Sequence, residues 1–241
     1  MSPDFAAQSP YAVRLEWGLN GVMEVANRGG VAVIVDVLSF SSCVDIACSR
    51  GSKVLPYRFN DHTAEGFARM HGAVLASRRG GGGFSLSPQS LLEIESGTKL
   101  VLPSPNGSTL SLACTAPVVL AGCLRNAAAV AAFARVQGGA ITLVAAGERW
   151  PDGSLRPSVE DLIGAGAIAH HLEGAKSPEA RIAETAFLAA RADLAGFLQR
   201  CASGVELISR GFAQDVGLAA QLGVSGVVPI LQDGAYTSAS T

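Results

Sequence analysis

One acid stands inside a long apolar run near the start of the chain. The segment VAVIVDVLSFSSC (31–43) has the consecutive apolar residues of a buried strand, yet it contains Asp36. A buried carboxylate is costly unless it is paired or bound to a metal ion. Asp36 falls near the end of the strand, just before a helix that we expect to start near Ser41 or Ser42. It could therefore hold a divalent cation, beside a phosphate at the helix N-terminus. The alternative is an acid that only braces the next turn.

A glycine-rich segment offers a second place for an anion. In SRRGGGGFSLSP (77–88), four consecutive glycines would let backbone amides approach an anion closely. Arg78 and Arg79 would supply positive charge and bidentate donors. The same stretch could instead be only a flexible hinge or an unordered loop, and no Walker-type GK[ST] follows it.

A turn after another apolar run gives a third candidate. In PSPNGSTLSLAC (103–114), Asn106-Gly107 is a turn signal, and Ser108 or Thr109 would then cap a helix. The exposed amides of this turn could receive an anion. The plain alternative is a connection between a strand and a helix.

Two adjacent acids make the fourth candidate. In RPSVEDLIGAGAIAHHL (156–172), Ser158 suits an N-cap, and Glu160 and Asp161 fall in the first helical turn. Acids there favour the helix dipole, and Asp161 has the spacing of a capping box. The same two carboxylates, beside a sheet edge, could ligate Mg²⁺. Taken alone, the segment favours capping.

The elements that must position these residues alternate between strands and helices. We expect strands over 31–38, 53–57, 73–77, 99–103, 118–122 and 140–147, with helices over 42–50, 61–70, 108–114, 126–136 and 158–172. This alternation is typical of an α/β layered domain, which binds ligands at the carboxyl ends of its strands.

The C-terminal part has a different pattern. Residues 174–225 should be mostly helical, with one long helix over 177–201 and one or two more over 203–223. A short strand over 226–231 precedes a polar tail, QDGAYTSAST, that we expect to be frayed. Residues 1–241 are therefore read as a single α/β domain, or as two closely packed subdomains.

Composition excludes several classes of protein. The chain has 241 residues and a formal net charge of −2, so it has no basic footprint for nucleic acid. No apolar run approaches the roughly 18 residues of a membrane span, and the N-terminus lacks the pattern of a secretory signal. The five cysteines include no CxxC pair, which favours free thiols in a reducing cytoplasm. The four histidines have no partners at metal spacing, and no G-x-S-x-G or HExxH motif is present.

Taken together and in order, five segments resemble one family, the 2-phosphosulfolactate phosphatases (ComB-like proteins). The segments are VIVDVLSFSSCVDIACSRGSKVLPY, SPNGSTLSL, VLAGCLRNAAAVA, AAGERWPDGSLRPSVEDLIGAGAI and SGVELISRGFAQDVGLAAQLGVSGVVPIL. The resemblance implies a three-layer α/β/α fold with a mixed, largely parallel sheet. It also implies a Mg²⁺-dependent phosphatase that releases phosphate from 2-phosphosulfolactate on the route to coenzyme M, and it suggests a homodimer.

The resemblance also suggests roles for individual residues. Asp36, Asn106, Glu160 and Asp161 fall on polar positions that the family shares. We expect Asp36 and Glu160 to hold Mg²⁺, and Asp36, Glu160 and Asp161 to form the catalytic set. The substrate-binding set is then Arg78, Asn106, Gly107, Ser108 and Ser158.

The chain departs from the family pattern at three positions. Ser39 replaces the arginine that usually follows Asp-Val-Leu, Ser77 replaces a glutamate, and Ser85 replaces an aspartate. Losing one cation and two carboxylates should weaken both the binding of a trianionic substrate and the binding of Mg²⁺. The chain could therefore act on a related, less anionic phosphate ester. The alternative is a catalytically degenerate member that binds a small anion without turnover.

Overall fold

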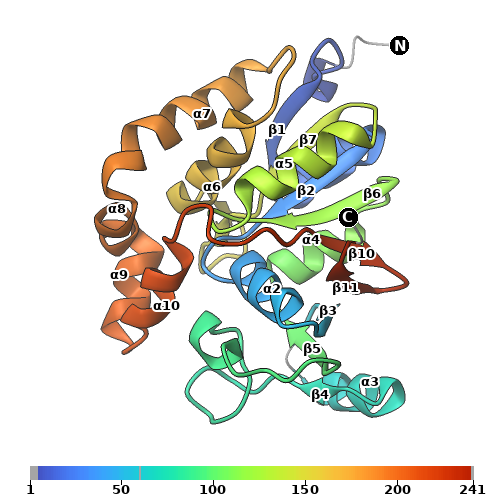
Figure 1. Ribbon diagram of the computed structural model, residues 1–241, viewed down its shortest axis with the longest axis vertical. Coiled ribbons are helices and arrows are strands. Elements are labelled where there is room, and N and C mark those ends of the chain that lie inside the picture. The colour runs from blue at the N-terminus through green and yellow to red at the C-terminus, as the bar shows by residue number, and fades with distance from the viewer. Residues whose placement is uncertain (1–4, 60, 240–241) are drawn as a thin grey trace.

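A nine-stranded sheet, with helices on both faces, forms the centre of the computed structural model, which describes residues 5–59 and 61–239 (Figure 1). The strand order is β1-β7-β2-β6-β10-β11-β3-β5-β4. These strands are β1 (Val13–Trp17), β2 (Val31–Val35), β3 (Lys53–Tyr57), β4 (Val74–Leu75), β5 (Lys99–Pro103), β6 (Val118–Gly122), β7 (Ile141–Ala145), β10 (Pro229–Gln232) and β11 (Ala235–Ser238). A separate small hairpin pairs β8 (Glu148–Arg149) with β9 (Leu155–Arg156).

Helices follow most of the strands. They are α1 (Gly18–Glu24), α2 (Phe40–Ser49), α3 (His62–His71), α4 (Gly107–Ala113), α5 (Ala127–Val136), α6 (Val159–His170), α7 (Pro178–Ala190), α8 (Leu194–Arg200), α9 (Ala202–Ser209) and α10 (Ala213–Ala219). Short 3₁₀ helices lie at Phe5–Ala7, Ala26–Arg28, Pro88–Leu91 and Arg191–Asp193. In Figure 1, α7 to α10 descend along the left side of the molecule, and α3 lies at the lower right.

The sheet consists of two parallel blocks joined by an antiparallel hairpin. Strands β1, β7, β2 and β6 are mutually parallel, and so are β3, β5 and β4. Between the blocks, β10 pairs antiparallel with β6, and β11 pairs antiparallel with β3. The predicted three-layer fold with a mixed, largely parallel sheet is thus confirmed.

The first block is buried on both faces, which explains its uninterrupted apolar sequence. In β2, Val31, Val33 and Val35 point into a core formed with α5, α6 and α7. Their neighbours Ala32 and Ile34 point to the opposite face, against α1 and α4. Because side chains alternate along a strand, a strand covered on both sides needs an apolar residue at every position.

The C-terminal tail is part of the sheet, so the prediction of a frayed tail is wrong for residues 232–239; residues 240 and 241 lie outside the described residues. Strand β11 runs over Ala235–Ser238, and its Tyr236 is fully buried. The Tyr236 hydroxyl lies 2.8 Å from the hydroxyl of Ser111. Asp233 and Gly234 both have positive φ and form the hairpin turn. Asp-Gly is a strong hairpin signal that the polar composition of the tail concealed.

The long helix predicted over 177–201 is interrupted. It ends as α7 at Ala190, passes through a 3₁₀ turn, and resumes as α8 at Leu194. The Asp193 carboxylate accepts a hydrogen bond from the Gly196 backbone at 2.9 Å, which starts the new helix. Strand β1 and helix α1, at the other end of the chain, were not predicted.

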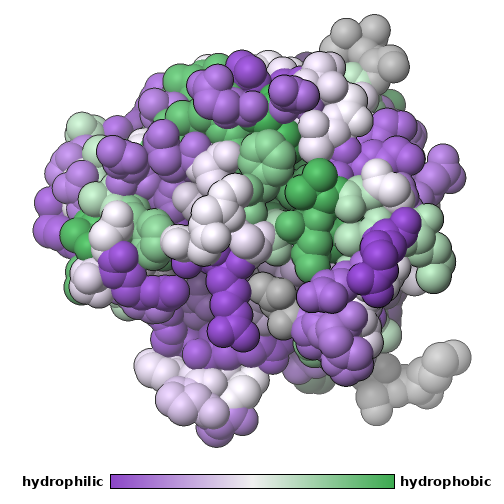
Figure 2. Space-filling model, turned by 90° about the horizontal axis from the view of Figure 1, so that it is seen from below, coloured by the Kyte–Doolittle hydropathy of each residue, from purple (hydrophilic) through white to green (hydrophobic). Residues whose placement is uncertain are grey.

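The five cysteines are free thiols, as predicted, and four of them are buried. None of the helices within the described residues is long and apolar enough to cross a membrane. The end of the molecule that carries α3 and the glycine-rich segment is largely hydrophilic, with smaller apolar areas between the polar groups (Figure 2).

Candidate active site

A cavity of about 480 Å³ opens where the strands of both parallel blocks end. Its walls come from the loop after β2, the segment after β4, the loop after β5, the start of β8 and one side of α9. The polar residues that line it are Asp36, Ser39, Ser77, Arg78, Arg79, Ser104, Asn106, Glu148, Ser203, Glu206 and Arg210. Three of the four polar segments noted in the sequence therefore meet at one cavity.

Asp36 joins the two blocks at the floor of this cavity. One carboxylate oxygen accepts the backbone N–H of Phe40 at 3.0 Å, and the other accepts the N–H of Gly107 at 2.9 Å. The carboxylate thus binds the first residues of α2 and α4 at once. Burial raises the pKa of Asp36 to about 6, although both backbone N–H groups act in the opposite direction.

The close approach of α4 to α2 explains the glycine at position 107. A β-carbon there would lie 2.2 Å from the Phe40 ring. Only glycine therefore lets the Gly107 N–H reach Asp36, and the Asn-Gly pair is needed for packing as well as for the turn.

Asp161 binds backbone in the same way but does not line the cavity. Its two oxygens accept the N–H groups of Val37 at 2.8 Å and Gly147 at 2.9 Å. Burial and the charge of Glu160 raise the pKa of Asp161 well above its usual range. The interpretation of Asp161 as half of a capping box is wrong, because its carboxylate ties the loops after β2 and β7 to α6.

Glu148, at the start of β8, is a cavity residue that the sequence interpretation missed. It lines the cavity with Asp36 and accepts a hydrogen bond from the Asn106 side chain at 2.9 Å. Burial and the charge of Asp36 raise the pKa of Glu148 to about 7. An acid directly after the glycine that follows a buried strand was a usable signal in AAGERW.

Glu160 is buried near these acids without lining the cavity. It is 2% exposed, and its charge raises the pKa of Asp36 and of Glu148. Within the described part of the chain, no group of three or more His, Cys, Asp or Glu side chains is arranged to hold a metal ion. The roles expected for Glu160 therefore stay predictions.

The predicted substrate-binding residues separate into two groups. Arg78 and Asn106 line the cavity, and the N–H of Gly107 is already bound to Asp36. Ser108 is fully buried and donates to the carbonyl of Leu102 at 2.8 Å. Ser158 occupies the N-cap position of α6 without a side-chain cap bond. The structure thus brings Arg78 and Asn106 to the cavity and gives Ser108 a partner in the backbone.

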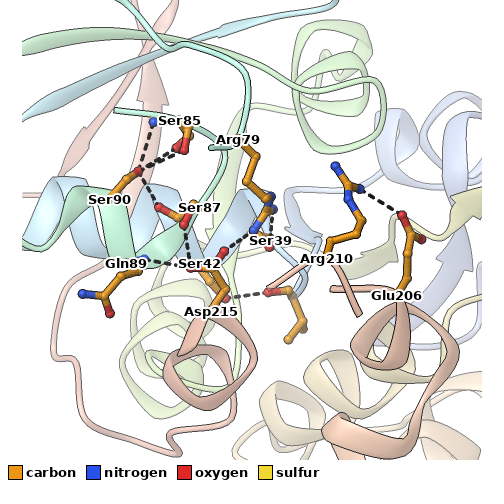
Figure 3. A network of polar contacts seen from close by, with 11 residues as sticks. Ser39, Ser42, Arg79, Ser85, Ser87, Gln89, Ser90, Glu206, Arg210 and Asp215 are labelled. Atoms are coloured by element: carbon orange, nitrogen blue, oxygen red, sulfur yellow. Dashed lines mark hydrogen bonds and ion pairs between the residues drawn. The ribbon is translucent and has the colours of Figure 1, made fainter. Parts of the chain in front are cut away.

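Arg79 is the more firmly held of the two neighbouring arginines. Its guanidinium forms an ion pair with Asp215 of α10 and donates to the Ser39 hydroxyl at 3.2 Å (Figure 3). It also lies over the Phe212 ring, 5.1 Å from the ring centroid. Asp215 was not predicted as a site residue, although it stands in the segment GFAQDVG that the family resemblance includes.

Each of the three substituted serines makes hydrogen bonds near the cavity or in the glycine-rich segment. Ser39 accepts from Arg79, and Ser77 donates to the carbonyl of Gly82 at 2.7 Å, which closes the glycine-rich loop. Ser85 contacts the Ser90 hydroxyl at 3.2 Å (Figure 3). Each serine hydroxyl therefore has a hydrogen-bond partner, although the charged side chains usual in the family are absent at these three positions.

The structure is thus an α/β protein with a cavity lined by acids and arginines at the ends of its strands. Residues 21–234 match the family model described as 2-phosphosulpholactate phosphatase, and the chain belongs to that family. It is 30% identical over 213 residues to the 2-phosphosulfolactate phosphatase of Methanothermobacter thermautotrophicus, covering 85% of this chain and 88% of that protein. It is 33% identical over 206 residues to the probable 2-phosphosulfolactate phosphatase of Carboxydothermus hydrogenoformans, covering 82% and 84%.

Proposed function

We propose that this protein is a phosphatase that hydrolyses a small anionic phosphate monoester, either 2-phosphosulfolactate or a close relative of it. One observation carries the proposal: Asp36 and Glu148 share a cavity with Arg78 and Arg79. Carboxylates can hold a cation and orient water, and arginines can bind the oxygens of a phosphate group. The family membership and the names of the relatives point to the same chemistry.

The donor set suits Mg²⁺. Asp36 and Glu148 lie close enough for the charge of Asp36 to raise the pKa of Glu148, and a cation between them would remove this repulsion. Mg²⁺ commonly takes only one or two carboxylates from a protein and completes its shell with water and substrate phosphate. We therefore assign Asp36 and Glu148 as the groups that would hold it. A bound Mg²⁺ would neutralise charge on the phosphoryl oxygens.

The chain's own residues supply the rest of the reaction. The Arg79 and Arg78 side chains bind phosphoryl or other acidic oxygens, and Asn106 keeps the Glu148 carboxylate in place through its side-chain amide. A carboxylate at the cavity floor orients the attacking water toward phosphorus. The water oxygen bonds to phosphorus as the P–O bond to the substrate alcohol breaks, and the proton lost by the water passes through the carboxylate or solvent to the leaving oxygen, so that the alcohol and inorganic phosphate leave.

The test is release of inorganic phosphate from 2-phosphosulfolactate, with MgCl₂ and with EDTA. We expect turnover that requires the divalent cation. A panel of monoesters that carry a sulfonate, a carboxylate or no second acid would then identify the substrate class. No release from any ester by a folded protein that binds phosphate would contradict the phosphatase proposal and favour the anion-binding alternative.

A further inference from the structure

The ion pair between Arg79 and Asp215 links two distant parts of the chain at the cavity wall. Arg79 belongs to the glycine-rich segment, and Asp215 belongs to α10 near the C-terminus. Both side chains are largely buried, with exposed fractions of 10% for Arg79 and 1% for Asp215. The Arg79 guanidinium is therefore held at one place while it still borders the cavity.

Asp215 is itself fixed by groups other than Arg79. One of its carboxylate oxygens accepts the Ser87 hydroxyl at 2.6 Å and the Gln89 backbone N–H at 3.0 Å. Its other oxygen faces Arg79 (Figure 3). Asp215 is thus anchored on one side and presents a fixed acceptor on the other, which is the arrangement of a residue that orients a neighbour.

Arg79 keeps binding capacity for a ligand. An arginine side chain carries more N–H donors than its contacts with Asp215 and Ser39 use. Arg78 provides the contrast. It is exposed, and its side chain makes no hydrogen bond or ion pair within residues 5–59 and 61–239. A ligand that binds Arg78 must immobilise a flexible side chain, whereas Arg79 is already placed.

We propose that Asp215 is a positioning residue that holds Arg79 as the main fixed anion-binding group of the cavity. The inference deepens the proposed function and rests on it in assigning the anion as the phosphate of the substrate. It also makes the site dependent on α10, although the Asp215 side chain does not line the cavity. Ser39, where the family usually has arginine, then serves as the second contact that orients Arg79.

A purely structural ion pair is the competing explanation, and the molecule contains a matched control. Arg125 and Asp45 form another largely buried pair, with exposed fractions of 11% and 0%, away from the cavity. Arg125 also donates to the carbonyl of Leu218 at the end of α10. Asp45→Asn therefore weakens a buried ion pair near α10 without touching Arg79.

The experiment measures binding of inorganic phosphate by titration calorimetry, with and without MgCl₂. Asp215→Asn retains an acceptor for Ser87 and Gln89 but loses the charge that faces Arg79. We expect it to weaken phosphate binding about tenfold. Asp45→Asn should lower the thermal midpoint by as much or more and leave phosphate affinity within about twofold of wild type.

A double-mutant cycle then separates positioning from general destabilisation. If Asp215 acts through Arg79, adding Asp215→Asn to Arg79→Ala should change phosphate affinity by less than about twofold. Three outcomes would each overturn the inference. The two substitutions could lower phosphate affinity by independent factors that multiply, Asp215→Asn could leave the affinity unchanged, or the wild type could bind no phosphate. Because the readout is binding, the two proposals can fail separately. If the wild type has no turnover, but Asp215→Asn weakens phosphate binding only when Arg79 is present, then only the phosphatase proposal is contradicted.

Discussion

Two buried aspartates at the carboxyl edge of the sheet bind the backbone in the same way and differ in what else they reach. Asp36 accepts N–H groups from the starts of α2 and α4, and Asp161 accepts N–H groups from the loops after β2 and β7. Both acids have raised pKa values because both are buried. Only Asp36 borders the 480 Å³ cavity.

Burial and hydrogen bonding do not by themselves mark a reactive acid. A carboxylate that accepts two buried N–H groups is needed by the fold, because those groups would otherwise lose their partners. Access to a ligand is the additional property that could give Asp36 a chemical role. Asp36 both binds backbone N–H groups and lines the cavity, whereas Asp161 only binds backbone N–H groups.

The largest effect that this comparison predicts is on turnover. Asp36→Asn keeps the size of the side chain and removes its charge, so the cavity floor loses its cation ligand. We expect phosphate release to fall about 10³-fold or more. The measurement is steady-state release of phosphate from the best ester of the panel, with circular dichroism to confirm folding. A folded Asp36→Asn protein with wild-type turnover would remove Asp36 from the site.

The next effect is on stability, at the other aspartate. Asp161→Ala leaves the buried N–H groups of Val37 and Gly147 without acceptors. Each unpaired group costs about 1–3 kcal/mol, so the free energy of unfolding should fall by about 3 kcal/mol. Urea denaturation gives this value, and phosphate binding by the folded fraction should persist. Full stability in Asp161→Ala would show that water replaces the carboxylate.

The sequence predicted every strand of the two blocks except β1, because burial on two faces leaves a clear apolar pattern. Strands β3, β5 and β6 have the predicted bounds. The prediction for the tail failed because the tail is polar in composition. Its place in the sheet depends on one buried side chain, Tyr236, and on an Asp-Gly turn. The pairing of β11 with β3 joins residues far apart in the chain, and local composition carries no signal for it.

The site was predictable in part for the same reason. Asp36 was found because an acid inside an apolar strand is conspicuous. Asp161 was placed correctly near the strand ends. Its carboxylate, however, accepts the N–H groups of Val37 and Gly147 in the loops after β2 and β7, so the local capping pattern predicted the wrong hydrogen bond. Asp215 reaches Arg79 across 136 positions. Only the fold brings that pair together.

A smaller effect concerns pH and the acid that faces Asp36. Burial raises the pKa of Glu148 from 4.5 to about 7, so between these values the folded protein holds a proton that the unfolded chain has released. Stability is therefore highest below the unfolded pKa and falls as pH rises through the folded one. Glu148→Gln cannot titrate and should gain stability over wild type on the order of 1 kcal/mol at pH 8, and little at pH 4. Urea denaturation in EDTA at both pH values tests this, and an equal difference at both would contradict it.

The smallest effect comes from the helix that carries Asp161. Ser158 is at the N-cap position of α6 without a side-chain cap bond, whereas the Ser177 hydroxyl of α7 accepts the Ala180 N–H at 3.2 Å. Ser177→Ala should therefore cost about 1 kcal/mol of unfolding free energy, and Ser158→Ala less than about 0.5 kcal/mol. Thermal and urea unfolding of the two variants give the comparison directly. Equal losses would mean that Ser158 caps α6 in solution, and that the start of α6 depends on local capping as well as on the Asp161 bonds to Val37 and Gly147.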